Sequence, residues 1–192
     1  MTGYRKFLCG AASVLALMTV SPAIAKEGPG TVGKSMPMAA PGPEITGLER
    51  LLAMEEMKNL RATFCRSLDS HDWDLLRTTI SDDFEMYFAQ TKGPDGPDVR
   101  PPIEVSGVTD YMAWLRKYLT GHSIHICTMP QFQFVTKDRA RALWFIQGYG
   151  DIGDMSGMGF ERIIEDYVKV NGKWLIKKAD GRVEALAMFP KN

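Results

Sequence analysis

The chain has 192 residues, of which 45% are hydrophobic and 24% charged, and its 23 basic and 23 acidic side chains leave a formal net charge of zero. This length and composition are typical of one globular domain. The chain has no basic excess and no long run of like charge, so we do not expect nucleic-acid binding, which generally requires a basic face.

The first 25 residues have the pattern of a secretory signal peptide. Arg5 and Lys6 precede the apolar run LCGAASVLALMTV, and Ala23-Ile24-Ala25 supplies a small-residue cleavage site. The run is shorter than the roughly 20 residues of a membrane-spanning helix, although an uncleaved anchor or a buried helix is the alternative. We therefore predict an exported, periplasmic protein without membrane contact after cleavage.

The mature chain is predicted to begin with a flexible leader. Residues 26–44 are rich in Gly and Pro and bury too little apolar surface to fold. A single domain is predicted over 45–192.

Two helices are predicted at the start of this domain. Thr46 and Glu49 have capping-box spacing, so a long helix is expected to begin there and to end near Asp69-Ser70. A shorter helix is predicted from Trp73 to Ile80, with Asp72 at its start.

A strand, a loop and a third helix are predicted next. Phe84, Met86 and Phe88 alternate with more polar residues, which indicates a strand, and the Gly- and Pro-rich residues 91–102 indicate a loop. Ser106 is predicted to cap a helix that runs through Leu119.

The rest of the chain is predicted to be β-structure, with antiparallel strands at 122–135, 140–150, 159–170 and 173–186. Residues 136–139 and 153–158 are predicted connections, and Asn171-Gly172 is a strong hairpin signal. Pro130 cannot donate a ladder hydrogen bond, so it marks a bulge or an edge strand. Early helices followed by hairpins predict an α+β domain, in which a curved antiparallel sheet wraps the long helix as a cone with a pocket between them.

His125 is the most informative residue of the first of these strands. Strand alternation places it on one face with Cys127, while Ile124 and Ile126 share the other face. A titratable ring that points inward needs a partner, a ligand or a chemical task.

The cysteines have three possible states. Cys65 precedes Asp69 by one helical turn, so both cysteines, Asp69 and His125 can converge. In an exported protein Cys65 and Cys127 can form a disulfide, or they can remain buried thiols. A metal site is the third state, although the spacing matches no standard metal motif.

Three stretches carry a resemblance to a known family: LRATFCRSLDSHDWDLL at 60–76, SIHICTMPQFQF at 123–134, and ERIIEDYVKVNGKWLIKK at 161–178. With the order of elements, they resemble the SnoaL-like branch of the nuclear transport factor 2-like superfamily, which includes scytalone dehydratase, bile-acid 7-alpha-dehydratase and hexachlorocyclohexane dehydrochlorinase. The resemblance implies the cone-shaped α+β fold, a homodimer paired through the outer sheet faces, and chemistry without a cofactor or metal.

By position, the resemblance implies that Asp69 and His125 are the family's catalytic dyad. Imidazole can take a proton near neutral pH, and a carboxylate beside it fixes its tautomer. Two positions depart from the family pattern. Phe64 stands where the dehydratases have Tyr or Lys, and the arginine of the last hairpin falls on Ala179 by simple counting, with Lys178 or Arg182 as substitutes.

The remaining site predictions concern substrate contacts and function. The predicted contacts are Phe64, Trp144, Cys127, Met129, Tyr149 and Arg182, whereas Glu161, Glu165 and Asp166 are expected mostly on a solvated face. The resemblance implies a lyase for a small hydrophobic, cyclic or aromatic molecule, acting by dehydration, elimination or retro-aldol cleavage. An isomerase with the same base and a non-enzymatic periplasmic domain that binds a small ligand are the alternatives.

Overall fold

The computed structural model describes residues 45, 47–91, 98, 101–152 and 154–191. The predicted signal peptide, the leader and the capping residue Thr46 lie outside the described residues, so these features remain predictions. In the part of the chain that is described, no helix combines the length and apolar character needed to cross a membrane.

The order of elements follows the sequence-based prediction, with one added strand. The elements are α1 (Gly47–Ser70), α2 (Trp73–Arg77), β1 (Ile80–Gln90), β2 (Ile103–Ser106), α3 (Val108–Tyr118), β3 (Ser123–Thr136), β4 (Arg139–Ile152), β5 (Met155–Val170) and β6 (Lys173–Pro190). The strand that the sequence analysis missed is β2, which has only four residues and follows the Pro-rich segment.

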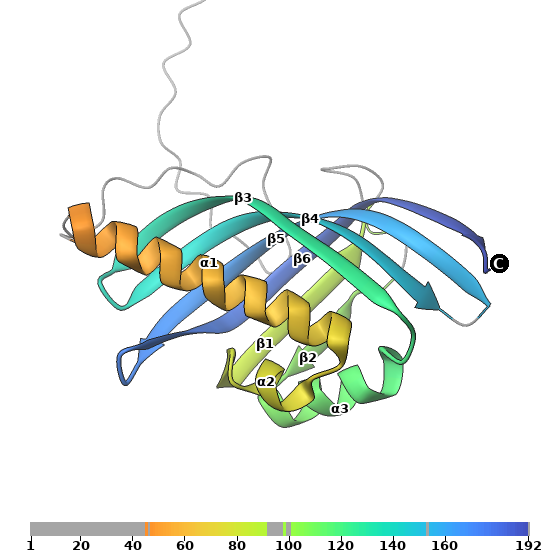
Figure 1. Ribbon diagram of the computed structural model, residues 1–192, viewed down its shortest axis with the longest axis horizontal. Helices are drawn as coiled ribbons and strands as arrows, with labels where there is room; N and C mark the ends of the chain where they lie inside the picture. The colour runs from red at the N-terminus through yellow and green to blue at the C-terminus, as the bar shows by residue number, and fades with distance from the viewer. Residues whose placement is uncertain (1–44, 46, 92–97, 99–100, 153, 192) are drawn as a thin grey trace, which may run out of the picture.

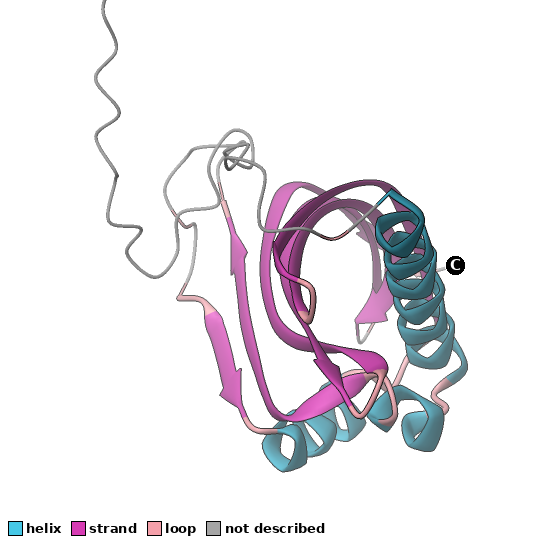
Figure 2. Cartoon of the chain, turned by 90° about the vertical axis from the view of Figure 1, so that its left-hand side faces the viewer, coloured by secondary structure: helices cyan, strands magenta, loops and turns pink. Residues whose placement is uncertain are grey.

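The strands form one strongly curved sheet in the order β2-β1-β6-β5-β4-β3. Neighbouring strands are antiparallel except for β1 and β6, which run parallel, so the sheet is mixed rather than wholly antiparallel as predicted. Helix α1 lies across the concave side, and α2 and α3 lie near one end of the sheet (Figures 1 and 2). The predicted α+β fold, in which a curved sheet wraps the long helix, is therefore confirmed, whereas core side chains occupy the space that was predicted to be a pocket.

The start of α2 agrees with the sequence-based prediction, but its end does not. The Asp72 side chain accepts a hydrogen bond from the Leu75 backbone N–H at 3.0 Å, which confirms the predicted cap. The helix ends at Arg77 and does not reach Ile80, because Ile80 pairs with Ile176 of β6.

The predicted cap of α3 is wrong. Ser106 is the last residue of β2, and Gly107 holds the N-cap position with a φ of 86° and no side-chain hydrogen bond. This left-handed conformation carries little steric cost for glycine, which explains the residue at this corner.

The Asn171-Gly172 hairpin agrees with its turn signal, whereas the predicted loop at 153–158 does not. Asn171 and Gly172 have φ values of 50° and 79°, as a two-residue hairpin turn requires. The β4–β5 pairing continues to Ile152 opposite Met155, so most of the predicted loop at 153–158 belongs to β5. Both readings of Pro130 are confirmed, since β3 is an edge strand and its register shifts between Thr128 and Gln131.

The core fills the space between α1 and the concave sheet face. Buried positions recur along one side of α1, where the large apolar side chains are Met57, Phe64 and Leu68. The sheet residues that complete this core are also large and apolar: Trp144, Ile146, Ile163, Tyr167, Trp174 and Ile176. Each fully buried side chain of this size contributes about 1.5–3 kcal/mol relative to exposure. This packing holds α1 rigidly over the sheet, and it fixes the position of every polar group on that side of the helix.

Candidate functional site

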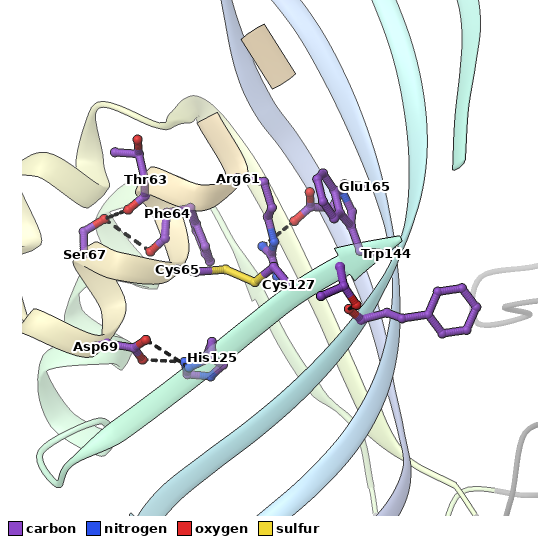
Figure 3. Close-up of a disulfide and its surroundings, with 12 residues drawn as sticks. Arg61, Thr63, Phe64, Cys65, Ser67, Asp69, His125, Cys127, Trp144 and Glu165 are labelled. Carbon is purple, nitrogen blue, oxygen red and sulfur yellow. Dashed lines mark hydrogen bonds and ion pairs between the residues drawn. A yellow bond between two sulfur atoms is a disulfide. The ribbon is translucent and has the colours of Figure 1, made fainter. Parts of the chain in front are cut away.

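One face of α1 carries three polar or reactive side chains at intervals of four residues, namely Arg61, Cys65 and Asp69. Residues four apart on an α-helix lie one above the other. Each side chain meets a residue on the concave face: Arg61 meets Glu165 of β5, and the other two meet β3 (Figure 3). An ion pair, a disulfide and a hydrogen-bonded dyad therefore connect helix and sheet in succession.

The dyad consists of Asp69 and His125. The His125 Nδ1 atom lies 2.6 Å from Asp69 Oδ1, and the His125 backbone N–H donates to Oδ2 at 2.9 Å. The Ser123 hydroxyl also donates to Oδ1, at 3.0 Å. An ionised carboxylate only accepts hydrogen bonds, so the neutral ring carries its proton on Nδ1 and has its lone pair on Nε2.

Asp69 remains ionised near neutral pH. Burial alone would raise its pKa, but the hydrogen bonds from the His125 ring and backbone, the His125 charge and the Ser123 hydroxyl together lower that pKa below its usual value. The two side chains are 23% and 21% exposed, so both are accessible to solvent. The pair thus has an oriented ring, a fixed negative charge and access.

The cysteines are joined. Cys65 and Cys127 form a disulfide across 62 residues of sequence. This decides among the three predicted states, because two sulfurs bonded to each other are neither free thiols nor thiolate ligands for a metal. The bond lies four residues from Asp69 on α1 and two from His125 on β3, so it anchors both elements beside the dyad. Cys127 shares the face of His125 as predicted, but its sulfur is directed to the helix.

A glycine opposite His125 leaves space beside its free nitrogen. Gly148 of β4 pairs with His125, and a Cβ atom on Gly148 would lie 3.6 Å from His125 Cδ2 and 3.8 Å from Nε2. The same point is 3.7 Å from Oε1 of Glu161. The His125 Nε2 atom and this carboxyl oxygen therefore border the same small volume, which no β-carbon of β4 fills.

The expectation that Glu161 and Glu165 belong to a solvated face is wrong. Glu161 pairs with Ile146, which in turn pairs with Cys127, so it lies on the concave face, and its side chain is partly buried. Burial raises the pKa of Glu161, opposed by the His125 and Arg61 charges. Only Asp166 lies on the convex face, where it pairs with Arg141 at 2.7 Å.

Glu165 belongs to a buried polar chain. Its Oε1 lies 2.5 Å from Arg61 Nη1, and the two side chains are 0% and 4% exposed. The Tyr167 hydroxyl donates to the other carboxyl oxygen, and the Trp144 indole N–H donates to that hydroxyl at 2.9 Å. Burial raises the pKa of Glu165 and the Arg61 charge opposes this rise. Arg61 was not among the residues predicted from the sequence, although its spacing of four from Cys65 and eight from Asp69 was an available signal.

Two predicted substrate contacts lie in the core beside this chain. Phe64 is buried, and the centre of its ring lies 4.8 Å from the Arg61 guanidinium carbon. Trp144 is also buried and is hydrogen-bonded to the Tyr167 hydroxyl. Both side chains belong to the packed core between the helix and the sheet.

The other three predicted contacts are wrong. Met129 is 68% exposed at the β3 bulge, which turns its side chain away from the interior. Tyr149 pairs with Ile124 and therefore lies on the convex face. Arg182 also lies on the convex face, where it binds Asp98 at 2.7 Å. Strand parity decides the last two, because an odd step from a concave residue points outward.

The arginine predicted at the last hairpin is absent from the concave face. Ala179 occupies that position directly opposite Glu165, as counting predicted. Lys178 faces outward and lies 3.6 Å from Glu85, so neither it nor Arg182 replaces the family residue. The guanidinium that contacts Glu165 on the concave face comes from Arg61 of α1 instead.

The model of the SnoaL-like domain family matches residues 49–180. No curated protein matches the sequence.

Solved structures with the same fold share little sequence. A Novosphingobium aromaticivorans protein provisionally named a scytalone dehydratase is 17% identical, with a TM-score of 0.64 over 75% of this chain and 92% of its own. The LinA-type3 hexachlorocyclohexane dehydrochlorinase of Novosphingobium barchaimii is 18% identical, with a TM-score of 0.62 over 75% of this chain and 94% of its own. An NTF2-like Pseudomonas putida protein of unknown function is 17% identical, with a TM-score of 0.53 over 69% of this chain and 87% of its own. At these identities the similarity establishes the fold.

Proposed function

Because the chain belongs to the SnoaL-like domain family, we propose that it is a cofactor-independent lyase in which His125 removes a proton from a small hydrophobic, cyclic or aromatic substrate. The observation that carries the proposal is the 2.6 Å contact between His125 Nδ1 and Asp69 Oδ1, which leaves Nε2 as the basic atom. The names of two structural neighbours, a dehydratase and a dehydrochlorinase, support an elimination.

The proposed step uses both members of the dyad. His125 Nε2 takes a proton from a carbon atom of the substrate, the C–H electron pair forms a double bond, and a leaving group departs from the neighbouring carbon. The Asp69 carboxylate stabilises the imidazolium that forms and keeps the ring in place. A positioned general base of this kind contributes about 10²–10⁴-fold to the rate.

A β-hydroxy ketone tests the proposal and separates two of the candidate reactions. Dehydration of 4-hydroxy-4-phenylbutan-2-one yields benzalacetone, whereas retro-aldol cleavage yields benzaldehyde and acetone, and chromatography resolves these products. We expect His125→Ala to lower kcat by about 10²–10⁴-fold, as loss of a general base does, and Asp69→Asn to lower it because the amide cannot stabilise the imidazolium. The matched control is His122→Ala, which removes an exposed histidine outside the dyad. Unchanged turnover in both dyad variants would overturn the proposal.

A ligand-binding function is the second candidate, and the isomerase alternative shares the base of the lyase. Phe64 and Ala179 favour binding, because both are apolar where the resemblance leads us to expect polar side chains. A binding domain would retain a co-purified small molecule unchanged, and His125→Ala would leave that retention intact. The binding function is contradicted if the wild type converts a substrate by removing a carbon-bound proton and His125→Ala does not form the product.

We also propose export to an oxidising compartment. The Cys65–Cys127 bond supports export, because structural disulfides persist in oxidising compartments such as the bacterial periplasm. Amino-terminal sequencing of the protein from the periplasmic fraction should begin at Lys26. An intact amino terminus in the cytosolic fraction would contradict the predicted cleavage.

A homodimer is the quaternary structure that we propose. Ile124, Ile126 and Phe160 are 48%, 51% and 52% exposed, and all three lie on the convex face, which offers an apolar surface to a second copy. Light scattering after gel filtration should report a dimer that Phe160→Glu dissociates, with the surface variant Glu85→Gln as the control. A wild-type monomer at all concentrations would exclude the dimer.

A further inference from the structure

Glu161 is a carboxyl group on the concave face that the dyad does not use. Its Oε1 lies 3.7 Å from the position of a Cβ on Gly148 and 3.8 Å from that of a Cβ on Gly159. These glycines pair with each other across β4 and β5, and Gly148 pairs with His125. Gly148 and Gly159 thus expose backbone without side chains on the concave face. The His125 ring and the carboxyl oxygen of Glu161 lie at the borders of this exposed backbone.

The surroundings of Glu161 favour its protonated form. Its strand neighbours across β4 and β6 are Ile146 and Val183, which are apolar and buried. Arg61 from α1 and, when its ring is protonated, His125 from β3 attract the charged form, but this attraction does not cancel the burial, so the pKa of Glu161 is raised. Within the described residues, no side chain forms a hydrogen bond or an ion pair with Glu161. A raised pKa keeps a carboxyl group protonated to a higher pH than usual, which is what a general acid requires.

We propose that Glu161 is the catalytic acid of the site, donating its proton to an oxygen leaving group while His125 removes the carbon-bound proton. This inference rests on the lyase function proposed above. The substrate lies over Gly148, with the reacting C–H bond toward Nε2 and the leaving oxygen toward Oε1.

The step balances without a cofactor. The C–H bond breaks as Nε2 gains its proton, the electron pair forms the C=C bond, and the C–O bond breaks. The oxygen leaves with the Glu161 proton as water. His125 is then an imidazolium and Glu161 a carboxylate, and a solvent molecule returns the proton from the ring to the carboxyl group.

The acid identifies the substrate class. Hydroxide is a poor leaving group and departs readily only when it is protonated, whereas chloride departs as the anion without a proton. An acid placed beside the base therefore selects β-hydroxy carbonyl compounds over their β-halo analogues. The reaction that follows from this geometry is dehydration.

Two probes that differ only in the leaving group test the role of Glu161. Both 4-hydroxy-4-phenylbutan-2-one and 4-chloro-4-phenylbutan-2-one yield benzalacetone, and the uncatalysed rate is subtracted from each. We expect Glu161→Gln to lower kcat for the hydroxy probe by about 10²–10⁴-fold, as loss of a general acid does. The chloro probe should keep its rate within a factor of three, an allowance of about 0.7 kcal/mol in the barrier. The matched control is Glu85→Gln, an exposed carboxylate on the convex face.

The outcomes separate this inference from the proposed function. If Glu161→Gln lowers kcat equally for both probes, Glu161 has a structural role and the proposed acid role is wrong. An unchanged kcat for both probes would also overturn the acid role. If His125→Ala keeps full activity on both probes, the proposed lyase function itself fails. A wild type that turns over neither probe refutes the proposed substrate class.

A second measurement needs no substrate. Infrared spectroscopy should show the band of a protonated carboxyl group at neutral pH that Glu161→Gln removes. The band should persist above the ordinary glutamate pKa of about 4.3. Ionisation of Glu161 within the ordinary range would overturn the acid role, because a carboxylate at neutral pH has no proton to donate.

Discussion

The Cys65–Cys127 disulfide is predicted to contribute a large part of the stability of the domain. The bond joins residues 62 positions apart, and it restricts the unfolded chain by closing a loop of that length. The chain-entropy relation gives about 14 cal/mol/K for such a loop, or about 4 kcal/mol at 25 °C. Since domains of this size are stable by about 5–15 kcal/mol, reduction should shift the unfolding transition markedly.

Urea unfolding with and without reductant measures this contribution. The reduced wild type keeps both cysteine side chains, so the difference in the free energy of unfolding isolates the covalent bond from the packing. The matched control is the double variant Cys65→Ala/Cys127→Ala, which should unfold identically with and without reductant. Tryptophan fluorescence is a suitable signal, since the chain has 4 Trp residues.

The dyad should survive reduction in the folded state. Asp69 and His125 remain joined by the ring contact and by the backbone hydrogen bond, neither of which involves sulfur. If the proposed lyase function is right, turnover by the reduced protein should therefore persist under conditions in which it stays folded. A stability difference below about 1 kcal/mol, against the expected 4, would refute the argument that the bond acts through the unfolded chain.

Three further changes test the interior and the site. Arg61→Met should cost about 3–5 kcal/mol in urea unfolding, because it leaves the Glu165 carboxylate buried without its cation, and adding Glu165→Leu should restore much of this stability; a single variant as stable as the wild type contradicts the account. The folded pKa of Asp69 lies below its unfolded value, so its contribution to stability is present above the unfolded pKa of about 3.9 and is lost as the pH falls through the folded pKa. The free energy of unfolding should therefore fall less steeply with decreasing pH below about pH 4 in Asp69→Asn than in the wild type. Identical slopes for the two proteins would be evidence against this linkage. Gly148→Ala should fold normally, since its methyl group meets neighbours at 3.6–3.8 Å, yet lose turnover because the methyl fills the space beside Nε2; full activity would show that substrate does not lie there. The comparison variant Gly181→Ala should instead lose about 1–3 kcal/mol, because its methyl would lie 2.6 Å from a phenylalanine ring.

Local features of the chain were predictable from the sequence because their causes are local. Asp72 caps α2, Asn171-Gly172 forms a hairpin turn, and Pro130 disrupts a ladder, each through the conformations and donors of adjacent residues. The common face of His125 and Cys127 follows from strand alternation alone. The resemblance added the partner Asp69, which no local pattern identifies.

The orientation of β5 could not be predicted from its own residues. Glu161, Ile163, Glu165 and Tyr167 alternate with Arg162, Ile164, Asp166 and Val168, so both faces combine two charged residues with two less polar ones. Only pairing with β4 turns the first set toward α1. The burial of Glu161 and Glu165 is therefore a tertiary property.

The sequence by itself determined the order of the elements other than β2, the hairpin turn and the face of His125, because each depends on neighbours within a few residues. Only the tertiary structure decided that Cys65 bonds Cys127, that Arg61 reaches Glu165, and that Glu161 borders the space beside His125. These contacts join residues between 36 and 104 positions apart. Their formation depends on the packing of α1 across the concave sheet, which no stretch of the sequence specifies alone.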